Sequence, residues 1–389
     1  MEVNPKPSAS KALSSRAATL TAAAIYMAVG ALFVAKYAAR VTEWWPLLTG
    51  MWTAVSAALT LWLAPALSSY GRRPLSTAWI KCALTASITA FAGMALLQGL
   101  LDPMSIKVDR WSALNNPISY LLDGRYPYMA QTHLGGYGSP FPVWQLLHIP
   151  FYLSGNVGLS FFAFLALWGW SIWHIQGRRA AVTALVLMAC QPAVWYETAV
   201  RSDLMANILL ATAAANLVLP HLNGEWMRRH FAVIAIVVAL LASTRLLTML
   251  PAVILLLPAW SRSGLKSQLL TPVIFALVFI ATFLPLAVWD PEAFFHFPYN
   301  PWVLQTRQGS ALDFIIFVPA AIALAMWWRR GATRYFTAAA ALTIIVVCVS
   351  FGDRMISTGD YALFSASYDI TYFSSCLPLV VTALSAKKC

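Results

Sequence analysis

Long apolar runs, separated by short polar segments, repeat along the whole chain. The runs are continuous rather than alternating and are about 20 residues long, which is typical of helices that cross a bilayer. The pattern predicts about twelve such helices, at residues 18–39, 47–68, 78–101, 156–176, 180–198, 204–221, 231–260 (two short helices in a hairpin), 268–289, 311–328, 335–351 and 368–386. We therefore expect an all-α, polytopic integral membrane protein.

One long segment, residues 102–155, interrupts this pattern between two apolar runs. It contains Asp109, Arg110, Asp123, Arg125 and His133 among glycines, prolines and tyrosines. Its apolar part, 141–153, is short and contains prolines, so we expect an interfacial or half-inserted helix there. We expect residues 1–17 to be a cytoplasmic tail and 18–389 to be a single transmembrane domain. The first helix is expected to be retained, because no small-residue cleavage site follows it.

Composition agrees with a membrane protein. Of the 389 residues 60% are hydrophobic and 10% are charged, and the mean hydropathy is +0.69, whereas about a quarter of a soluble domain is charged. Five cysteines, Cys82, Cys190, Cys348, Cys376 and Cys389, are scattered without the spacing of a metal or redox pair. They are expected to serve as small apolar residues.

The net charge of +12 is explained by where the charges lie. Most of the basic residues fall at the helix ends predicted to be cytoplasmic: 6, 11, 16, 72, 73, 81, 178, 179, 228, 229, 262, 266, 329, 330, 334, 387 and 388. All acidic residues except Glu2 and Glu225 fall on the opposite side. The basic bias follows the positive-inside rule. It indicates orientation in a membrane, most simply a bacterial inner (plasma) membrane, and gives no support to nucleic acid as a partner. Chemistry is expected on the outer, acidic face.

Asp109 begins the polar segment a few residues after the third apolar run. One interpretation is a solvated carboxylate that caps the helix starting near Trp111. The other is a general base at the membrane surface, because an attacking hydroxyl must lose its proton.

The rest of the segment carries an ordered set of turn-forming and aromatic residues: Gly124, Pro127-Tyr128, Tyr137 and Ser139-Pro140, followed by the apolar half-helix. This order, led by Asp109, resembles the first outer loop of the GT-C glycosyltransferases, in particular their polyprenol-phosphate-mannose-dependent branch. The likeness is close over 109–142 and loose over 100–310. Two features differ, since two spans precede the helix that bears the loop, and Gly138-Ser139 interrupts the family's Tyr-Pro-Pro.

The resemblance implies a GT-C-like fold, with a large first outer loop carrying interfacial helices, and an inverting reaction. A hexose or pentose, most simply mannose, would move from a polyprenyl-phosphate carrier to a lipid or glycan acceptor hydroxyl. Asp109 would be the catalytic base, and Tyr128 and Tyr137 would lie at the substrate.

A second polar cluster, "YETAVRSD", contains Arg201 and Asp203. Arg201 suits a carrier phosphate, because a guanidinium keeps its charge and offers several donors; an ion pair with Asp203 or Glu197 is the alternative. Asp203 is a second catalytic candidate, for orienting the acceptor. A divalent ion between Asp203 and Asp109 is also left open, although no spacing demands a metal or another cofactor.

Three further arginines are candidate substrate ligands. Arg245 interrupts an apolar stretch, where a charge is costly and either extends to the interface or faces a cavity and, here, the donor phosphate. Arg307 ends a loop, 290–310, whose acids and aromatics either pack on a sugar or anchor the protein at the interface. Arg354 is a second phosphate candidate, whereas Asp369 is explained by capping the last span. The histidines lack zinc spacing.

The leading hypothesis is therefore a membrane glycosyltransferase with a lipid-linked donor. "HLGGYG" is not followed by the Lys-Ser/Thr helix start of a nucleotide loop. The alternatives are a secondary transporter or flippase, and a lipid-linked glycan polymerase or ligase. Transporters usually have two similar halves, and no such repeat is evident here.

Overall fold

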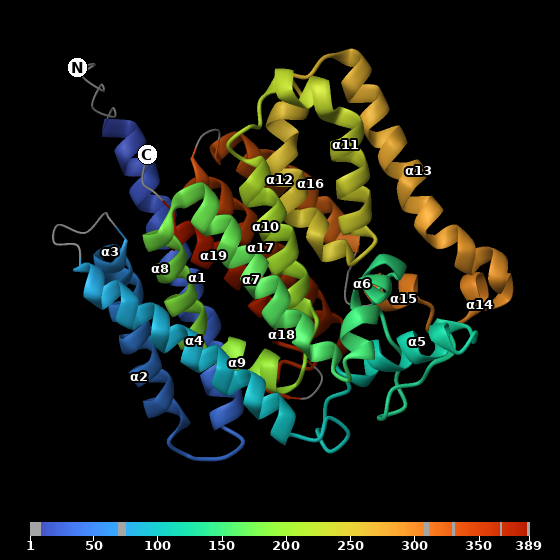
Figure 1. The fold of residues 1–389 in the computed structure, drawn as a ribbon, viewed down its shortest axis with the longest axis horizontal. Helices are drawn as coiled ribbons and strands as arrows, with labels where there is room; N and C mark the ends of the chain where they lie inside the picture. Colours follow the sequence, from blue (N-terminus) through green and yellow to red (C-terminus); the bar gives the residue numbers. More distant parts are fainter. Residues whose placement is uncertain (1–8, 69–74, 307–310, 329–330, 366–367, 387–389) are drawn as a thin grey trace.

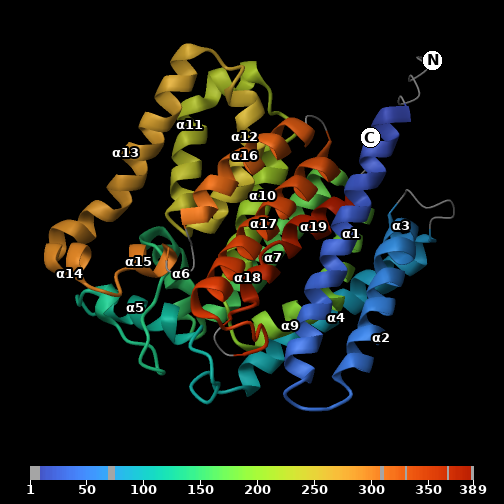
Figure 2. The ribbon, with the colours of Figure 1, turned by 180° about the vertical axis from the view of Figure 1, so that it is seen from behind.

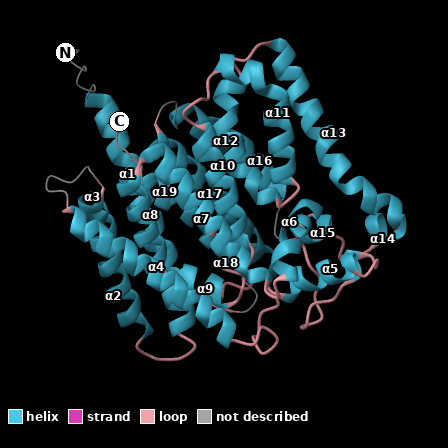
Figure 3. Ribbon diagram, viewed as in Figure 1, coloured by secondary structure: helices cyan, strands magenta, loops and turns pink. Residues whose placement is uncertain are grey.

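The computed structural model of the chain describes residues 9–68, 75–306, 311–328, 331–365 and 368–386. Regular structure in these ranges is helical, apart from an isolated antiparallel bridge between Gln131 and Tyr137 (Figures 1 and 3). The helices are α1 Ala9–Ala38, α2 Trp45–Ala58, α3 Ala64–Leu67, α4 Thr77–Leu100, α5 Ser112–Leu122, α6 Pro142–Leu153, α7 Ser160–Gln176, α8 Arg178–Cys190, α9 Pro192–Ala199, α10 Leu204–Val218, α11 Gly224–Ala242, α12 Met249–Trp260, α13 Leu265–Trp289, α14 Pro291–His296, α15 Pro301–Thr306, α16 Ala311–Trp328, α17 Ala332–Thr358, α18 Thr371–Ser374 and α19 Leu377–Ser385. The all-α prediction is confirmed.

Several of these helices are long and apolar enough to cross a bilayer. Among the described residues there are 6, within Ser15–Ala38, Trp45–Leu67, Thr77–Leu100, Val157–Gln176, Leu265–Trp289 and Ala332–Thr358. There are 7 if α8 and α9, which meet at a bend of 70°, form one broken span. Four shorter apolar segments lie at Leu204–Val218, Leu246–Trp260, Ile315–Trp328 and Thr371–Ser385. The chain is thus compatible with a multi-pass membrane protein, while the count of twelve stays a prediction.

The central bundle is built from α1, α7, α8, α10, α17 and α19. Figure 2 shows α1 beside α2 and against α17 and α19, and the three helices share one buried cluster. Small residues line these contacts, among them Ala22 of α1, Ala339 of α17 and Ala383 of α19, all buried. Small side chains let helix backbones approach closely, which favours packing where lipid removes the hydrophobic driving force.

A second group of short helices, α5, α6, α14 and α15, lies at one end of the molecule (Figure 1, lower right). Buried Tyr128 and Phe141 of the 102–155 segment pack there with Phe283 and Phe294. The amide groups of Phe141 and Val143 donate to the carbonyls of Thr244 and Ser243, at 3.2 Å each. The short helix expected at 141–153 is confirmed as α6, and it is fixed to the connection between α11 and α12.

Several boundaries differ from the sequence prediction. α1 begins at Ala9, within the segment expected to be a tail, and the span expected at 180–198 is broken at Gln191. Pro192 explains the break, because a proline forces the residue before it out of the helical conformation; Gln191 has ψ 120°. The 290–310 loop contains α14 and α15, whose first-turn amides donate capping bonds to the side-chain oxygens of Asp290 and Asn300. The hairpin predicted within 231–260 is confirmed as α11 and α12.

Candidate functional site

A buried ion pair, Asp203–Arg245, lies at the centre of the candidate site. Asp203 precedes α10, and Arg245 stands in the connection between α11 and α12. The Nη2 of Arg245 lies 2.7 Å from Oδ1 and its Nε 2.9 Å from Oδ2, and the side chains are 8% and 5% exposed. Two parallel N–H···O bonds fix both groups in orientation as well as in charge. The cavity-facing interpretation of Arg245 therefore agrees with its burial better than extension to the interface does.

Asp203 is also held from a third element. The indole Nε1 of Trp144, in α6, donates to its Oδ2 at 2.7 Å. Burial disfavours the charged form of Asp203, but Arg245 and the Trp144 bond more than offset this, so its pKa lies below its ordinary value. A carboxylate with a low pKa and engaged oxygens is a poor proton acceptor. The geometry therefore favours a positioning role for Asp203, holding Arg245 and α6 together.

Arg245 lines a cavity of about 330 Å³. Its polar lining also includes Gln305, Asp313, Ser350 and Tyr372, whereas the rest of the lining is mostly apolar: Leu204, Leu246, Leu247, Met249, Leu250, Phe317, Val346, Val347 and Phe351. Ser350 donates to Asp313 Oδ2 at 2.8 Å. A concave site with an apolar body and a few fixed polar groups suits an amphipathic ligand. The guanidinium makes an anionic head group the best match.

The end of the 102–155 segment closes against this region. Ser139 lies with its Oγ 3.3 Å from Arg245 Nη1, and its carbonyl accepts from Gln305 Nε2 at 2.8 Å. Gly138 precedes it because no larger residue fits: a Cβ there would lie 2.1 Å from the main-chain oxygen of Ala113. Gly138 thus lets the loop pack on α5.

Asp109 is half-buried at the start of the same segment. Its Oδ2 accepts a bond from Thr132 Oγ1 at 2.9 Å, and its Oδ1 makes no hydrogen bond to any described residue. The α5 helix has no side-chain cap; the main-chain carbonyl of Asp109 accepts from Ala113 instead. The capping interpretation is therefore wrong, and one carboxylate oxygen stays open to a ligand.

Arg110, which the sequence analysis did not single out, connects Asp109 to the last helices. It pairs with Asp369 and lies 3.5 Å from the Oγ1 of Thr371. Asp369 also accepts from the amide of Thr371 at 3.1 Å, as expected of a residue that caps this helix start. Arg110 therefore holds the start of the 102–155 segment, which contains Asp109, against α18.

The surroundings of Arg110 are acidic. Burial disfavours its charge, but Tyr372 and the carboxylates of Glu197, Asp203 and Asp109 favour it, and its pKa is raised. Glu197, in α9, is fully buried, and neither of its carboxylate oxygens has a hydrogen-bond partner among the described residues. Sequence reasoning named Glu197 only as a pairing partner, and its burial had no signal in the sequence.

Arg201 faces away from the cavity. Its Nη2 donates to the carbonyls of Gln98 and Leu101 at the end of α4, the second at 2.9 Å. Of the residues described, it is the one non-glycine with a positive φ, 53°. The expected pairs with Asp203 or Glu197 do not form, because Asp203 is taken by Arg245. Burial lowers the pKa of Arg201. A phosphate role for Arg201 stays a prediction, while its contacts are those of a helix C-cap.

The remaining predicted ligands are dispersed. Tyr128 is buried, and its hydroxyl donates to the carbonyl of Pro140 at 3.0 Å. Tyr137 stacks on Tyr299 with ring centroids 5.0 Å apart. Arg354 is exposed and lies over the ring of Tyr368 at 5.7 Å. Arg307 lies outside the described residues.

Two polar residues of the loop have structural roles. His133 contacts the Oγ of Ser112 at 2.7 Å and the carbonyl of Ile106 at 3.0 Å. Asp123 pairs with Arg125 at the surface, beside Gly124 with its φ of 70°, as expected of a residue in a turn. In the part of the chain that the structure describes, no three His, Cys, Asp or Glu residues are grouped as a metal site would need.

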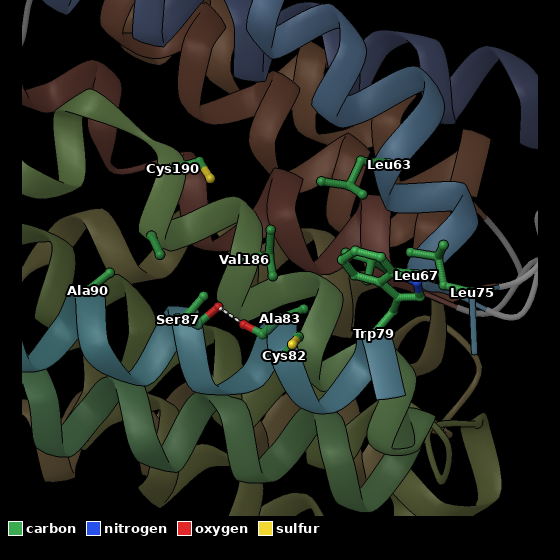
Figure 4. Close-up of a pocket in the computed structure, with 12 residues that line it drawn as sticks. Leu63, Leu67, Leu75, Trp79, Cys82, Ala83, Ser87, Ala90, Val186 and Cys190 are labelled. Carbon is green, nitrogen blue, oxygen red and sulfur yellow. Dashed lines mark hydrogen bonds between the residues drawn. The ribbon is translucent and has the colours of Figure 1, made fainter. Parts of the chain in front are cut away.

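A second cavity, of about 400 Å³, lies between α3, α4 and α8 (Figure 4). Apolar side chains such as Leu63, Trp79 and Val186 line it. The hydroxyl of Ser87 donates to the carbonyl of Ala83 within α4, at 2.9 Å. No charged side chain lines this cavity. Its chemistry is limited to holding apolar groups, so it does not compete with the Arg245 cavity as a reaction site.

Comparisons with known proteins do not identify a related protein for this chain. No family model, curated protein or solved structure matches the chain. The structure brings Arg110 near the carboxylates of Asp109, Glu197 and Asp203 and pairs Asp203 with Arg245. It leaves Arg201 and Arg354 outside this cluster. Trp144 and Arg110 were missed, although both lie in the polar segment that the sequence analysis selected.

Proposed function

We propose that the protein is a membrane glycosyltransferase that moves a sugar from a polyprenyl-phosphate carrier to an acceptor hydroxyl on the outer face. One observation carries the proposal: the guanidinium of Arg245 lines a largely apolar cavity. A polyprenyl phosphate combines the matching groups, an anionic head and a long apolar tail. The bidentate hold of Asp203 on Arg245 supports it, because a pre-oriented guanidinium loses little entropy on binding phosphate.

Asp109 supplies the base in this scheme. Its open Oδ1 takes the proton of the acceptor hydroxyl while the acceptor oxygen bonds to the anomeric carbon of the sugar. The bond from that carbon to the phosphate oxygen breaks, and the phosphate leaves with the electron pair. Arg245 stabilises the added negative charge, a term that is large where water is excluded. The carboxylate of Asp203 keeps Arg245 in place throughout.

The wider setting belongs to the same proposal. About twelve spans place both termini in the cytoplasm and the 102–155 segment on the outer face of a bacterial inner membrane. In Figure 1 the 261–264 and 101–111 connections lie at opposite ends of the molecule, which supports this alternation. The donor reaches the site on its own lipid anchor, and the acceptor is a lipid or a glycan. No metal ion takes part in the scheme.

A secondary transporter is the second candidate, favoured by one observation. The α8–α9 pair is bent by 70°, and its second half carries the buried carboxylate of Glu197, which has no hydrogen-bond partner among the described residues. Broken helices with ionisable residues mark transport sites. Substrate uptake into sealed vesicles with no covalent product would favour this candidate over glycosyl transfer.

The test of the first candidate is Asp109→Asn, with Asp123→Asn as its matched control. Both remove one carboxylate from the same segment, but Asp123 is exposed and pairs only with Arg125. Sugar transfer from a purified polyprenyl-phosphate donor is expected to fall by about 10²-fold or more in Asp109→Asn. Transfer is expected to be unchanged in the control. Near wild-type transfer by Asp109→Asn would remove the base assignment.

A further inference from the structure

A long apolar groove separates α4 from α7, and α8 forms its floor. Its volume, about 820 Å³, exceeds that of the Arg245 cavity. Each helix contributes one face to the groove, with Ile88 and Phe91 from α4, Phe162 and Trp173 from α7, and Arg178 and Leu185 from α8 among the lining residues. Both α4 and α7 pack on α8. The groove is thus built by three neighbouring helices that leave a channel between them.

Hydrogen bonds at both ends fix how the three helices are aligned. At one end Arg179 Nη1 donates to the carbonyl of Leu75, which joins the start of α8 to the start of α4 at 3.0 Å. At the other end Gln98 of α4 and Asn156, just before α7, are joined at 3.1 Å. The start of α4, the end of α7 and the start of α8 therefore lie together.

All the charge of the groove is positive and lies at this end. Arg178 lines the groove, and Lys81 is exposed one turn before Leu84 on the face of α4 that lines it. Residues 77–101 and 157–191 contain no Asp or Glu. The cations of this end thus face no carboxylate from the helices that form the groove.

Two tryptophans place the same end at the membrane surface. Trp79 is 63% exposed near the start of α4, and Trp173 is 60% exposed near the end of α7. Exposed tryptophans gather where hydrocarbon meets head groups. From Leu84 to Ala95 the groove follows α4 for roughly 17 Å at 1.5 Å per residue, which matches the hydrocarbon thickness of one leaflet, about 15 Å.

We propose that this groove binds an anionic glycerophospholipid. Its acyl chains lie along α4 and α7, and its phosphate lies between Arg178 and Lys81. A zwitterionic lipid fills the apolar part equally well, but its added positive charge gains less from two cations with no acid beside them. The site does not depend on glycosyl transfer, because none of its lining residues belongs to the Arg245 cavity.

Native mass spectrometry of the full chain in detergent tests the proposal. The purified protein is offered equal amounts of phosphatidylglycerol and phosphatidylcholine with identical acyl chains. We expect phosphatidylglycerol to be retained in preference. The double variant Lys81→Gln/Arg178→Gln is expected to lose about twentyfold or more of this preference, since each cation near the head group is worth about fivefold. Phosphatidylcholine retention is expected to stay as in the wild type.

The matched control is Arg228→Gln/Lys266→Gln, which removes the same charge from two exposed residues outside the groove. A filler variant, Gly169→Leu, tests the apolar part, because the nearest atom to a Cβ at Gly169 is Leu185 Cδ2 at 3.7 Å and a larger side chain enters the groove. It is expected to reduce retention of both lipids. An unchanged preference in the Lys81/Arg178 variant, an equal loss in the control, or full lipid retention in Gly169→Leu would each overturn the proposal.

Discussion

Two buried arginines, Arg201 and Arg245, differ in whether they bind the carboxylate of Asp203. Arg201 is two residues from Asp203 in the chain, yet it donates to main-chain carbonyls at the end of α4. Arg245, far away in sequence, forms the bidentate pair with Asp203 and lines a cavity. Arg201 uses its Nη2 group at a helix end and does not line the Arg245 cavity, although its Nε has no partner among the described residues. Arg245 presents its guanidinium to the cavity, where its Nη1 contacts Ser139. Function is therefore expected at Arg245.

The backbone explains the choice. At Arg201 φ is 53°, a left-handed conformation that costs an L-residue about 1–2 kcal/mol. This conformation turns the side chain away from Asp203 and toward α4. The carbonyl bonds at the end of α4 offset that cost, because the last turn of a helix leaves its carbonyls without partners.

The largest expected effect on stability comes from removing the ion pair between Arg245 and Asp203. Arg245→Ala leaves the Asp203 carboxylate buried without its partner, which costs about 3–5 kcal/mol. We expect a loss of that size in the apparent free energy of unfolding in detergent. The double variant Asp203→Asn/Arg245→Gln is expected to recover much of it, because no buried charge remains. Arg354→Ala, at an exposed position, is the control, with a change within about 0.5 kcal/mol.

The second prediction concerns the protonation of His148, a buried residue near the Asp203–Arg245 pair. His148 contacts the Trp144 carbonyl at 2.8 Å, and its Nε2 has no partner in the described part of the chain. Burial lowers the pKa of His148 from 6.5 to about 4. The folded protein therefore binds fewer protons than the unfolded chain between these values. Stability is full above pH 6.5 and falls, by about 3 kcal/mol in total, as the pH drops to 4. Thermal melting against pH measures this. His148→Phe is expected to flatten that part of the profile; a profile unchanged by the substitution would contradict the burial argument.

The substitution Arg201→Gln tests the contacts of Arg201 with the end of α4. This removes bonds from a charged donor to the carbonyls of Gln98 and Leu101, worth about 2 kcal/mol. The expected result is a lower melting temperature and faster hydrogen exchange at the end of α4, with binding at the Arg245 cavity retained. Loss of phosphate-ligand binding with normal stability would instead make Arg201 a ligand residue.

The smallest expected effect concerns the support of the loop near Ser139. Tyr137 stacks on Tyr299 with an interplanar angle of 14°. Tyr137→Leu removes an aromatic pair worth about 1 kcal/mol. We expect a correspondingly small loss of melting temperature, measured against Tyr120→Leu, whose ring contacts Arg125 instead. A loss of several kcal/mol would show that Tyr137 organises the whole segment.

Periodicity and length were enough to predict the long apolar helices, the α11–α12 hairpin around Arg245 and the short α6, but not α14 and α15 within the predicted 290–310 loop. The break between α8 and α9 had a signal in Pro192, but the apolar run continues across it. The early start of α1 had none, because residues 9–17 mix small and basic side chains without an apolar period. Such boundaries depend on packing that the sequence pattern does not contain.

The candidate site was predictable only as a set of residues. Asp109, Asp203 and Arg245 stood out because charges are rare in this chain, and rarity is a local property. The pairing of Asp203 with Arg245 rather than Arg201 is a contact between distant segments, set by how α10 and α11 pack. The same applies to Arg110 with Asp369. The pattern of a single sequence holds no information on such pairings.

The most direct test of the account is binding of polyprenyl monophosphate to purified protein. The variants are the neutral pair Asp203→Asn/Arg245→Gln and Arg201→Gln, and polyprenol without phosphate is the control ligand. We predict that the neutral pair binds the phosphate at least tenfold more weakly than the wild type, while Arg201→Gln stays within about twofold, in line with the value of a charged hydrogen bond. Wild-type phosphate binding by the neutral pair would contradict the assignment of the cavity to a lipid phosphate.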